Sequence, residues 1–212
     1  MFLNDQLYFA KGYKIDEIKV LVTKYKKTKD CQVLSELICV TKSRFNRYFD
    51  FFDLYFEYRN QFVDISSKEQ CGTRTLSLMH DFLVVSSMCT IIESFYQFLL
   101  GINETDKPNV KAYQFVFTKM NRVNSCYNVD SANAFYNRIR NKLIHQNKTN
   151  IDAALCDGGK PVSFSTNNVF LCHPRAFYTD IKSIVNEYFN NLHQTNEQEL
   201  SRFITKIDSI ID

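Results

Sequence analysis

Apolar residues recur at three- and four-residue spacing along most of this chain, which is the pattern of amphipathic helices. The two longest stretches that carry this spacing lie at about 32–62 and 73–101. Only 5 Gly and 3 Pro occur among 212 residues, so the chain has few of the tight turns that join many short strands. We therefore predict an all-α fold, an up-and-down bundle of about six or seven helices.

The expected helices follow one another with short polar breaks between them. Besides a motif-bearing helix that ends near 145–147, we expect them at 15–29, 32–62, 73–101, 110–123, 177–192 and 197–211. Residues 1–13 are expected to form an irregular arm. Near 160–172, two apolar runs flank the turn residues Thr166–Asn168, which predicts a small β-hairpin insertion.

No repeat, low-complexity run or linker divides the chain, so we predict one domain over residues 1–212. In this domain the helices within 15–62 pack onto a core of about 70–195. The aromatic residues at three- and four-residue steps between 45 and 59 are expected to pack in the core rather than to stack on bases.

The seven cysteines are odd in number and widely spaced, and no Cys-x-x-Cys occurs. This favours free thiols in a reducing cytosol over a disulfide framework or a zinc ribbon. The first residues lack a basic leader followed by an apolar run, so we expect no signal peptide and a cytoplasmic protein. A net charge of +3 and a pI near 8.4 permit nucleic-acid binding without requiring it.

The segment 82–102 is apolar enough to be mistaken for a membrane span. It carries Glu93, Gln97 and several serines, which favours a central core helix and a protein without membrane contact. A buried carboxylate needs a cationic or hydrogen-bonding partner. For Glu93 we expect that partner to be Arg138 or Arg140.

The stretch Ala134–His145 is predicted to be one amphipathic helix, capped by Asp130 or Ser131. Its core face is expected to hold Ala132, Phe135, Tyr136, Ile139 and Leu143. The opposite flank carries Arg138, Asn141 and His145 at positions i, i+3 and i+7.

The run Arg140-Asn141-Lys142-Leu143-Ile144-His145 resembles the signature of the HEPN superfamily. In that signature an Arg and a His lie four to six residues apart, and a polar residue often follows the Arg. The setting is also similar, because a long apolar helix with an acidic residue, here Glu93, precedes the motif helix. The resemblance implies a metal-independent RNA-cleaving site, without a cofactor, formed across a twofold homodimer.

The resemblance also implies roles for the motif residues, and these roles suit their chemistry. His145 would move the proton of the ribose 2′-hydroxyl or of the leaving oxygen. Arg140 would hold the scissile phosphate, and Asn141 would orient the phosphate or the imidazole. On an ideal helix Arg140 and His145 lie about 140° apart. Either the helix ends or distorts before His145, or a second subunit supplies a partner residue; Arg138, which shares a face with His145, is the alternative arginine.

Three hypotheses for function follow. The first is a HEPN-type endoribonuclease that acts on RNA as a toxin or phage-defence effector, with an antitoxin or another defence protein as a partner. The second is a catalytically inactive HEPN-like module that binds RNA, a nucleotide or a protein, and the third is an unrelated helical adaptor with an accidental motif.

Other charged and titratable groups are weaker candidates. His80, His173 and His193 are expected to be structural or surface residues. The lysines of the first helix are expected to form a solvated face, with a phosphate-binding strip as the alternative.

Overall fold

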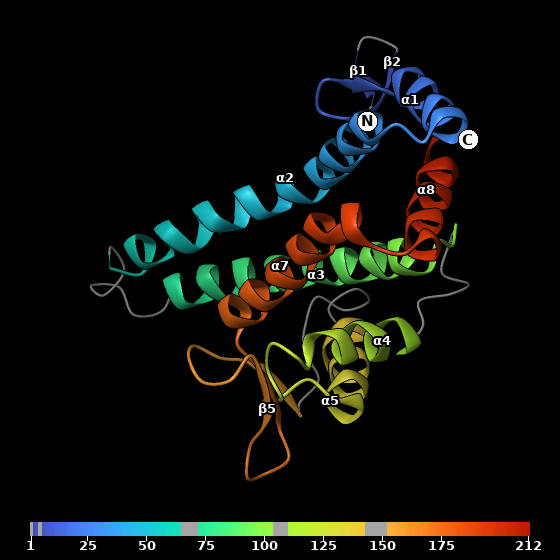
Figure 1. Cartoon of the computed structure of the whole chain (residues 1–212). Helices are drawn as coiled ribbons and strands as arrows, with labels where there is room; N and C mark the ends of the chain where they lie inside the picture. Colours follow the sequence, from blue (N-terminus) through green and yellow to red (C-terminus); the bar gives the residue numbers. More distant parts are fainter. Residues whose placement is uncertain (1, 4–5, 65–71, 104–109, 143–151) are drawn as a thin grey trace. The chain divides into compact units, whose positions relative to one another are not determined.

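A computed structural model describes residues 2–3, 6–64, 72–103, 110–142 and 152–212. The predicted fold class is confirmed: the chain is mostly helical, with small β insertions (Figure 1). The helices are α1 (Ile15–Thr28), α2 (Cys31–Asp64), α3 (Gly72–Leu100), α4 (Val110–Met120), α5 (Val129–Ala134), the π-helix η1 (Phe135–Arg140), α7 (Pro174–Asn191), the short 3₁₀-helix η2 (Leu192–Gln194) and α8 (Glu197–Ile211). Six of the predicted helices are found within a few residues of their expected bounds.

The N-terminal residues form strands rather than the irregular arm that we predicted. β1 (Phe2–Leu3), β2 (Gln6–Ala10) and β3 (Tyr13–Lys14) pair as an antiparallel meander. Gly12 makes the turn before β3 possible, because its φ of +82° lies in the left-handed region that glycine adopts without strain. Strands this short, with an irregular register, leave no period-2 pattern to read in the sequence.

The predicted β-hairpin is confirmed, but it belongs to a larger sheet. β5 (Val162–Phe164) and β6 (Phe170–Cys172) pair antiparallel around the expected turn. β4 (Ala153–Leu155) pairs parallel with the other edge of β6, which gives the order β4-β6-β5. We expected loop at β4, because a three-residue strand whose partner lies far along the chain has no local signal.

The chain forms two compact units, each assembled from separate segments. Unit 1 comprises Met1–Tyr48, Ser94–Lys107 and Val185–Asp212, and unit 2 comprises Phe49–Glu93 and Pro108–Ile184. Helices α2, α3 and α7 therefore each contribute one part to unit 1 and another part to unit 2. The single domain with its N-terminal helices on a 70–195 core stays a prediction.

Unit 1 has an aromatic core and a helix pair, α1 and α8, that pack side by side (Figure 1). The rings of Phe45, Phe98 and Phe189 lie within 5.4–6.2 Å of one another. Gly101 ends α3 as predicted, with a φ of +67°. A Cβ at Gly101 would lie 2.7 Å from the Cα of Arg202, so this close approach of backbones also requires glycine.

Unit 2 is built around a second aromatic core. Phe135 of η1 packs on Phe177 with ring centroids 4.8 Å apart, and Phe117 contacts both Phe135 and Tyr127. The part of α2 in this unit buries Phe49, Phe52 and Phe56 against Tyr178. The expected core role of these α2 aromatics is thus confirmed.

One described helix, the α3 stretch Asp81–Leu100, is long and apolar enough to cross a membrane by length and composition. Within the structure 44% of this window is buried, and core helices of soluble proteins meet the same criterion. The stretch therefore gives weak evidence for a membrane span.

Candidate functional site

The cap of the motif helix is Asn128, not Asp130 or Ser131 as we predicted. The Asn128 side chain accepts a hydrogen bond from the Ser131 backbone N–H at 2.9 Å, and the Ser131 hydroxyl accepts one from the Asn128 N–H at 2.8 Å. This reciprocal pair is a capping box, and it fixes where the helix starts. Ser131 is thus part of the cap but at its third helical position.

The prediction of one continuous α-helix is wrong for the segment Phe135–Arg140. This segment is a π-helix, closed by a hydrogen bond from the Asn141 N–H to the Tyr136 carbonyl, five residues back. Short π-helical segments are frequent at functional sites. The π-helix ends at Arg140, which is only 5% exposed. It therefore precedes the stretch from Arg140 to His145 to which our two alternatives apply, and both stay predictions.

Arg140 is held by Glu93, so the ion pair predicted for that carboxylate is confirmed. The Arg140 Nε and Nη2 atoms lie 3.1 Å and 2.9 Å from Glu93 Oε1. Arg140 Nη1 donates to Asn141 Oδ1 at 3.2 Å. The structure therefore brings together Glu93, Arg140 and Asn141, three of the residues that we selected from the sequence.

Sequence analysis did not select Tyr113, which completes this cluster from α4. Its hydroxyl donates to the same Glu93 Oε1 at 2.9 Å, and its ring lies 5.3 Å from the Tyr136 ring. The Arg140 guanidinium lies 5.5 Å from the centre of the Tyr136 ring. Tyr113 lies in the helix predicted at 110–123, and a buried tyrosine hydroxyl needs a polar partner. That signal was available in the sequence.

Burial and charge set the protonation states in this cluster. Burial alone would lower the pKa of Arg140, but the Glu93 carboxylate and Tyr113 together outweigh it and hold the pKa above its ordinary value. Burial raises the pKa of the adjacent Cys89 thiol to about 12, and burial also raises the pKa of Tyr113. Arg140 is therefore permanently charged at neutral pH, while Cys89 and Tyr113 are neutral.

Arg138, the alternative motif arginine, has different partners. Its Nη1 donates to the Asn168 carbonyl at 2.7 Å, and its Nε lies 3.2 Å from Asp152 Oδ2. Its guanidinium also lies 5.6 Å from the centre of the Phe164 ring. Arg138 thus fastens the β5–β6 turn to the motif helix, which is a structural task.

His145, with Leu143, lies outside the described residues, so the structure places the arginine of the motif but not its histidine. Of the other histidines, His193 is exposed in η2. His173 precedes Pro174, the first residue of α7, and its N–H donates to the Pro161 carbonyl.

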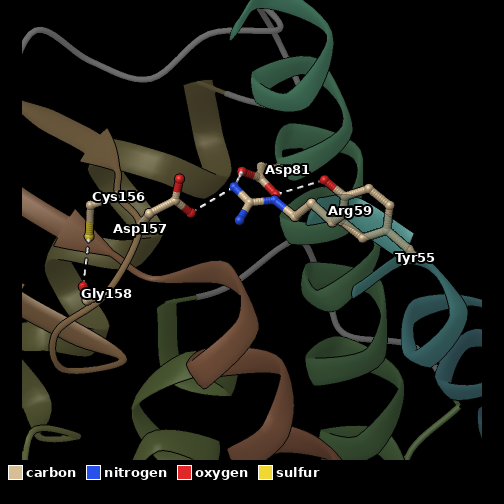
Figure 2. A network of polar contacts seen from close by, with 6 residues as sticks. All are labelled: Tyr55, Arg59, Asp81, Cys156, Asp157 and Gly158. Carbon is tan, nitrogen blue, oxygen red and sulfur yellow. Dashed lines mark hydrogen bonds and ion pairs between the residues drawn. The ribbon is translucent and has the colours of Figure 1, made fainter. Parts of the chain in front are cut away.

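A second polar cluster, which sequence analysis did not select, lies in unit 2 (Figure 2). Asp81 of α3 is buried and accepts hydrogen bonds from Tyr55 at 2.9 Å and from Arg59 Nη2 at 2.6 Å, both of α2. The same Nη2 lies 2.7 Å from Asp157, which is largely exposed in the loop after β4. Burial raises the pKa of Asp81 against the opposing effect of Arg59. The cluster ties this loop to two helices of its unit.

Within the described ranges, no group of three or more His, Cys, Asp or Glu side chains is arranged to hold a metal ion. No family model matches the chain, and neither a curated protein nor a solved structure is significantly similar to it.

Proposed function

We propose that the chain is a HEPN-like, metal-independent endoribonuclease whose site is built on Arg140, Asn141 and His145. One observation carries this proposal: Arg140, five residues before His145 in the sequence, is held in a fixed position and in its charged form by Glu93. A fixed guanidinium is the group that an RNA phosphate requires.

Arg140 has more N–H donors than its hydrogen bonds to Glu93 and Asn141 use. Two of its five N–H groups point to Glu93 and one points to Asn141. One N–H on each of Nη1 and Nη2 lies outside these bonds. In the proposed reaction, these donors would bind phosphate oxygens and offset the charge of the transition state.

The reaction uses the nucleophile of RNA itself. The 2′-hydroxyl gives its proton to a His145 imidazole, and its oxygen attacks the phosphorus as the bond to the 5′-oxygen breaks. That leaving oxygen takes a proton from an imidazolium, and the product ends in a 2′,3′-cyclic phosphate. Each step is a proton transfer or a phosphoryl transfer, so no cofactor takes part.

The same proposal includes the setting in which the enzyme acts. We expect a homodimer in the cytoplasm without membrane contact, which acts as a toxin or phage-defence effector and is restrained by an antitoxin or another defence protein. These partners come from the resemblance of the motif alone.

A second function, a catalytically inactive HEPN-like module that binds RNA, a nucleotide or a protein, has one observation in its favour. The Arg140 side chain is only 6% exposed and already has internal partners. An arginine in such a position can serve the fold alone.

Cleavage of RNA by purified protein in EDTA separates the two functions. We expect the wild type to produce 2′,3′-cyclic phosphate ends, and His145→Ala to be slower by at least about a hundredfold. Arg140→Lys keeps the charge opposite Glu93 but loses the forked guanidinium. We therefore expect this variant to fold and its cleavage rate to fall by a similar factor. The matched controls are His193→Ala and Arg175→Lys, because both side chains are exposed.

Intact RNA with every preparation, together with tight RNA binding, would establish the inactive module. Cleavage that persists in His145→Ala at the wild-type rate would mean that a contaminating nuclease is measured.

A further inference from the structure

Helix α1 in unit 1 buries only one side and leaves a basic side in solvent. Ile18, Val22 and Tyr25 are at most 4% exposed, and α1 packs on α8, β2 and β3. The other side is a continuous surface, which we call the lysine face. It consists of Lys19, Val20, Thr23, Lys24, Lys27 and Thr28.

Among the described residues, no acidic side chain pairs with the charges of the lysine face. Lys26, on the edge towards α8, forms an ion pair with Asp208. By contrast, Lys19, Lys24 and Lys27 have no ion-pair partner among the residues that the structure describes, and all three are exposed. The acids of α1, Asp16 and Glu17, lie in its first turn, before the lysines begin.

We infer that the lysine face binds the phosphate backbone of single-stranded RNA. From Lys19 to Lys27 the helix rises about 12 Å, so the three lysines can contact more than one phosphate of the same strand. The exposed Thr23 hydroxyl can donate to a phosphate oxygen. This inference rests on the proposed function, because its ligand belongs to the class of the proposed substrate.

The composition of the lysine face favours RNA over an anionic membrane. A helix that lies in a membrane interface needs a broad apolar face with large side chains. The apolar side of α1 is already covered, and Val20, 66% exposed, is the apolar residue on the open side. Binding by this face would therefore be electrostatic and independent of base sequence.

The test measures RNA binding in the His145→Ala background, in which the proposed catalysis is removed. Fluorescence anisotropy with a labelled RNA of about 20 nucleotides gives the Kd of Lys19→Gln/Lys24→Gln/Lys27→Gln across a salt series. Each lost phosphate contact lowers the slope of log affinity against log salt by about 0.7, so the slope should fall by about 2. Between about 50 and 200 mM salt, the parent should lose roughly twentyfold more affinity than the triple variant.

The matched control is Lys111→Gln/Lys119→Gln/Lys160→Gln, which removes the same charge from exposed positions in unit 2. An equal change of slope in both triple variants, or no change in either, would overturn the inference. So would unchanged RNA binding together with lost binding to phosphatidylserine vesicles.

The two proposals fail in different ways. RNA binding that depends on the lysine face, with no cleavage by the wild type, would remove the nuclease and keep this surface. Cleavage with an unchanged KM by the triple variant would keep the nuclease and remove this surface.

Discussion

A single oxygen atom organises the candidate site. Glu93 Oε1 accepts hydrogen bonds from Arg140 Nε, Arg140 Nη2 and the Tyr113 hydroxyl. From the sequence, the need of Glu93 for a partner was predictable, because a carboxylate in an apolar helix cannot stay unpaired. Which of Arg138 and Arg140 would be this partner was not predictable, because the answer depends on the π-helix. The cluster around Asp81 was also not predictable, because its members Tyr55, Arg59 and Asp157 join Asp81 from three separate segments of the chain.

Removing the Glu93 carboxylate should destabilise the protein strongly. Glu93→Ala leaves the Arg140 charge without its main partner, and loss of one member of a buried pair costs about 3 kcal/mol. Urea unfolding measures this free energy. Glu57→Ala, at an exposed position of α2, should change it by no more than about 0.5 kcal/mol.

A double variant distinguishes the ion pair from general packing. Glu93→Met/Arg140→Met should lose clearly less than the sum of the two single replacements, because neither charge is then left unpaired. Additive losses would show that the pair is not coupled in the folded protein.

The helices were predictable because their apolar spacing is a local property. Five of the described helices, α1, α2, α3, α7 and α8, match their predicted ranges closely, and α4 ends slightly early. Two features were not predicted, because they have no local signal in the sequence: the parallel strand β4, and the π-helix in place of a regular turn. The latter decides the environment of Arg140, so the element that bears the motif was the least predictable part of the helical fold.

The start of the motif helix depends on the Asn128 cap. Asn128→Ala removes the acceptor of the Ser131 N–H and should lower the free energy of unfolding by about 1 kcal/mol. Chemical denaturation measures the change, and Asn137→Ala, exposed in η1, is the control. Equal effects of the two substitutions would contradict a capping role.

A polar contact between α2 and α7 in unit 2 should make stability depend on pH. Burial acts to raise the pKa of Asp53, but hydrogen bonds from Lys182 and Tyr178 outweigh it and lower the pKa below 3.8. Asp53 therefore stabilises the fold fully above its unfolded pKa, and this contribution is lost as the pH falls through the lower folded value. Asp53→Asn should cost up to about 1 kcal/mol at neutral pH, since the pair is half exposed.

Unfolding of the wild type and Asp53→Asn at neutral and acidic pH tests this contact. The two free energies should converge as the pH drops below about 4. A difference that stays constant through this range would mean that the carboxylate charge plays no part.

At the scale of the molecule, the apolar spacing together with the low Gly and Pro content predicted a mostly helical chain. The division into two units was not predictable, because it follows from which segments pack together and leaves no linker to find. The single domain of the sequence analysis and the HEPN relationship both remain predictions.

The proposed twofold site requires two chains. We expect sedimentation equilibrium at micromolar concentration to give about 50 kDa, twice the 25.0 kDa of one chain. Mixing inactive His145→Ala chains with wild type should then lower cleavage more than simple dilution does. A 25.0 kDa species that cleaves RNA at full rate would exclude a shared site.

The order of segments along the chain has a consequence for synthesis on the ribosome. Unit 2 ends at Ile184, whereas unit 1 needs both the first 48 residues and the segment from Val185 onwards. Nascent domains usually fold in the order in which they emerge, but here the N-terminal helices must wait for the last ones. Until then, the apolar side of α1 has no α8 to cover it, so products truncated before residue 185 should attract chaperones and proteases.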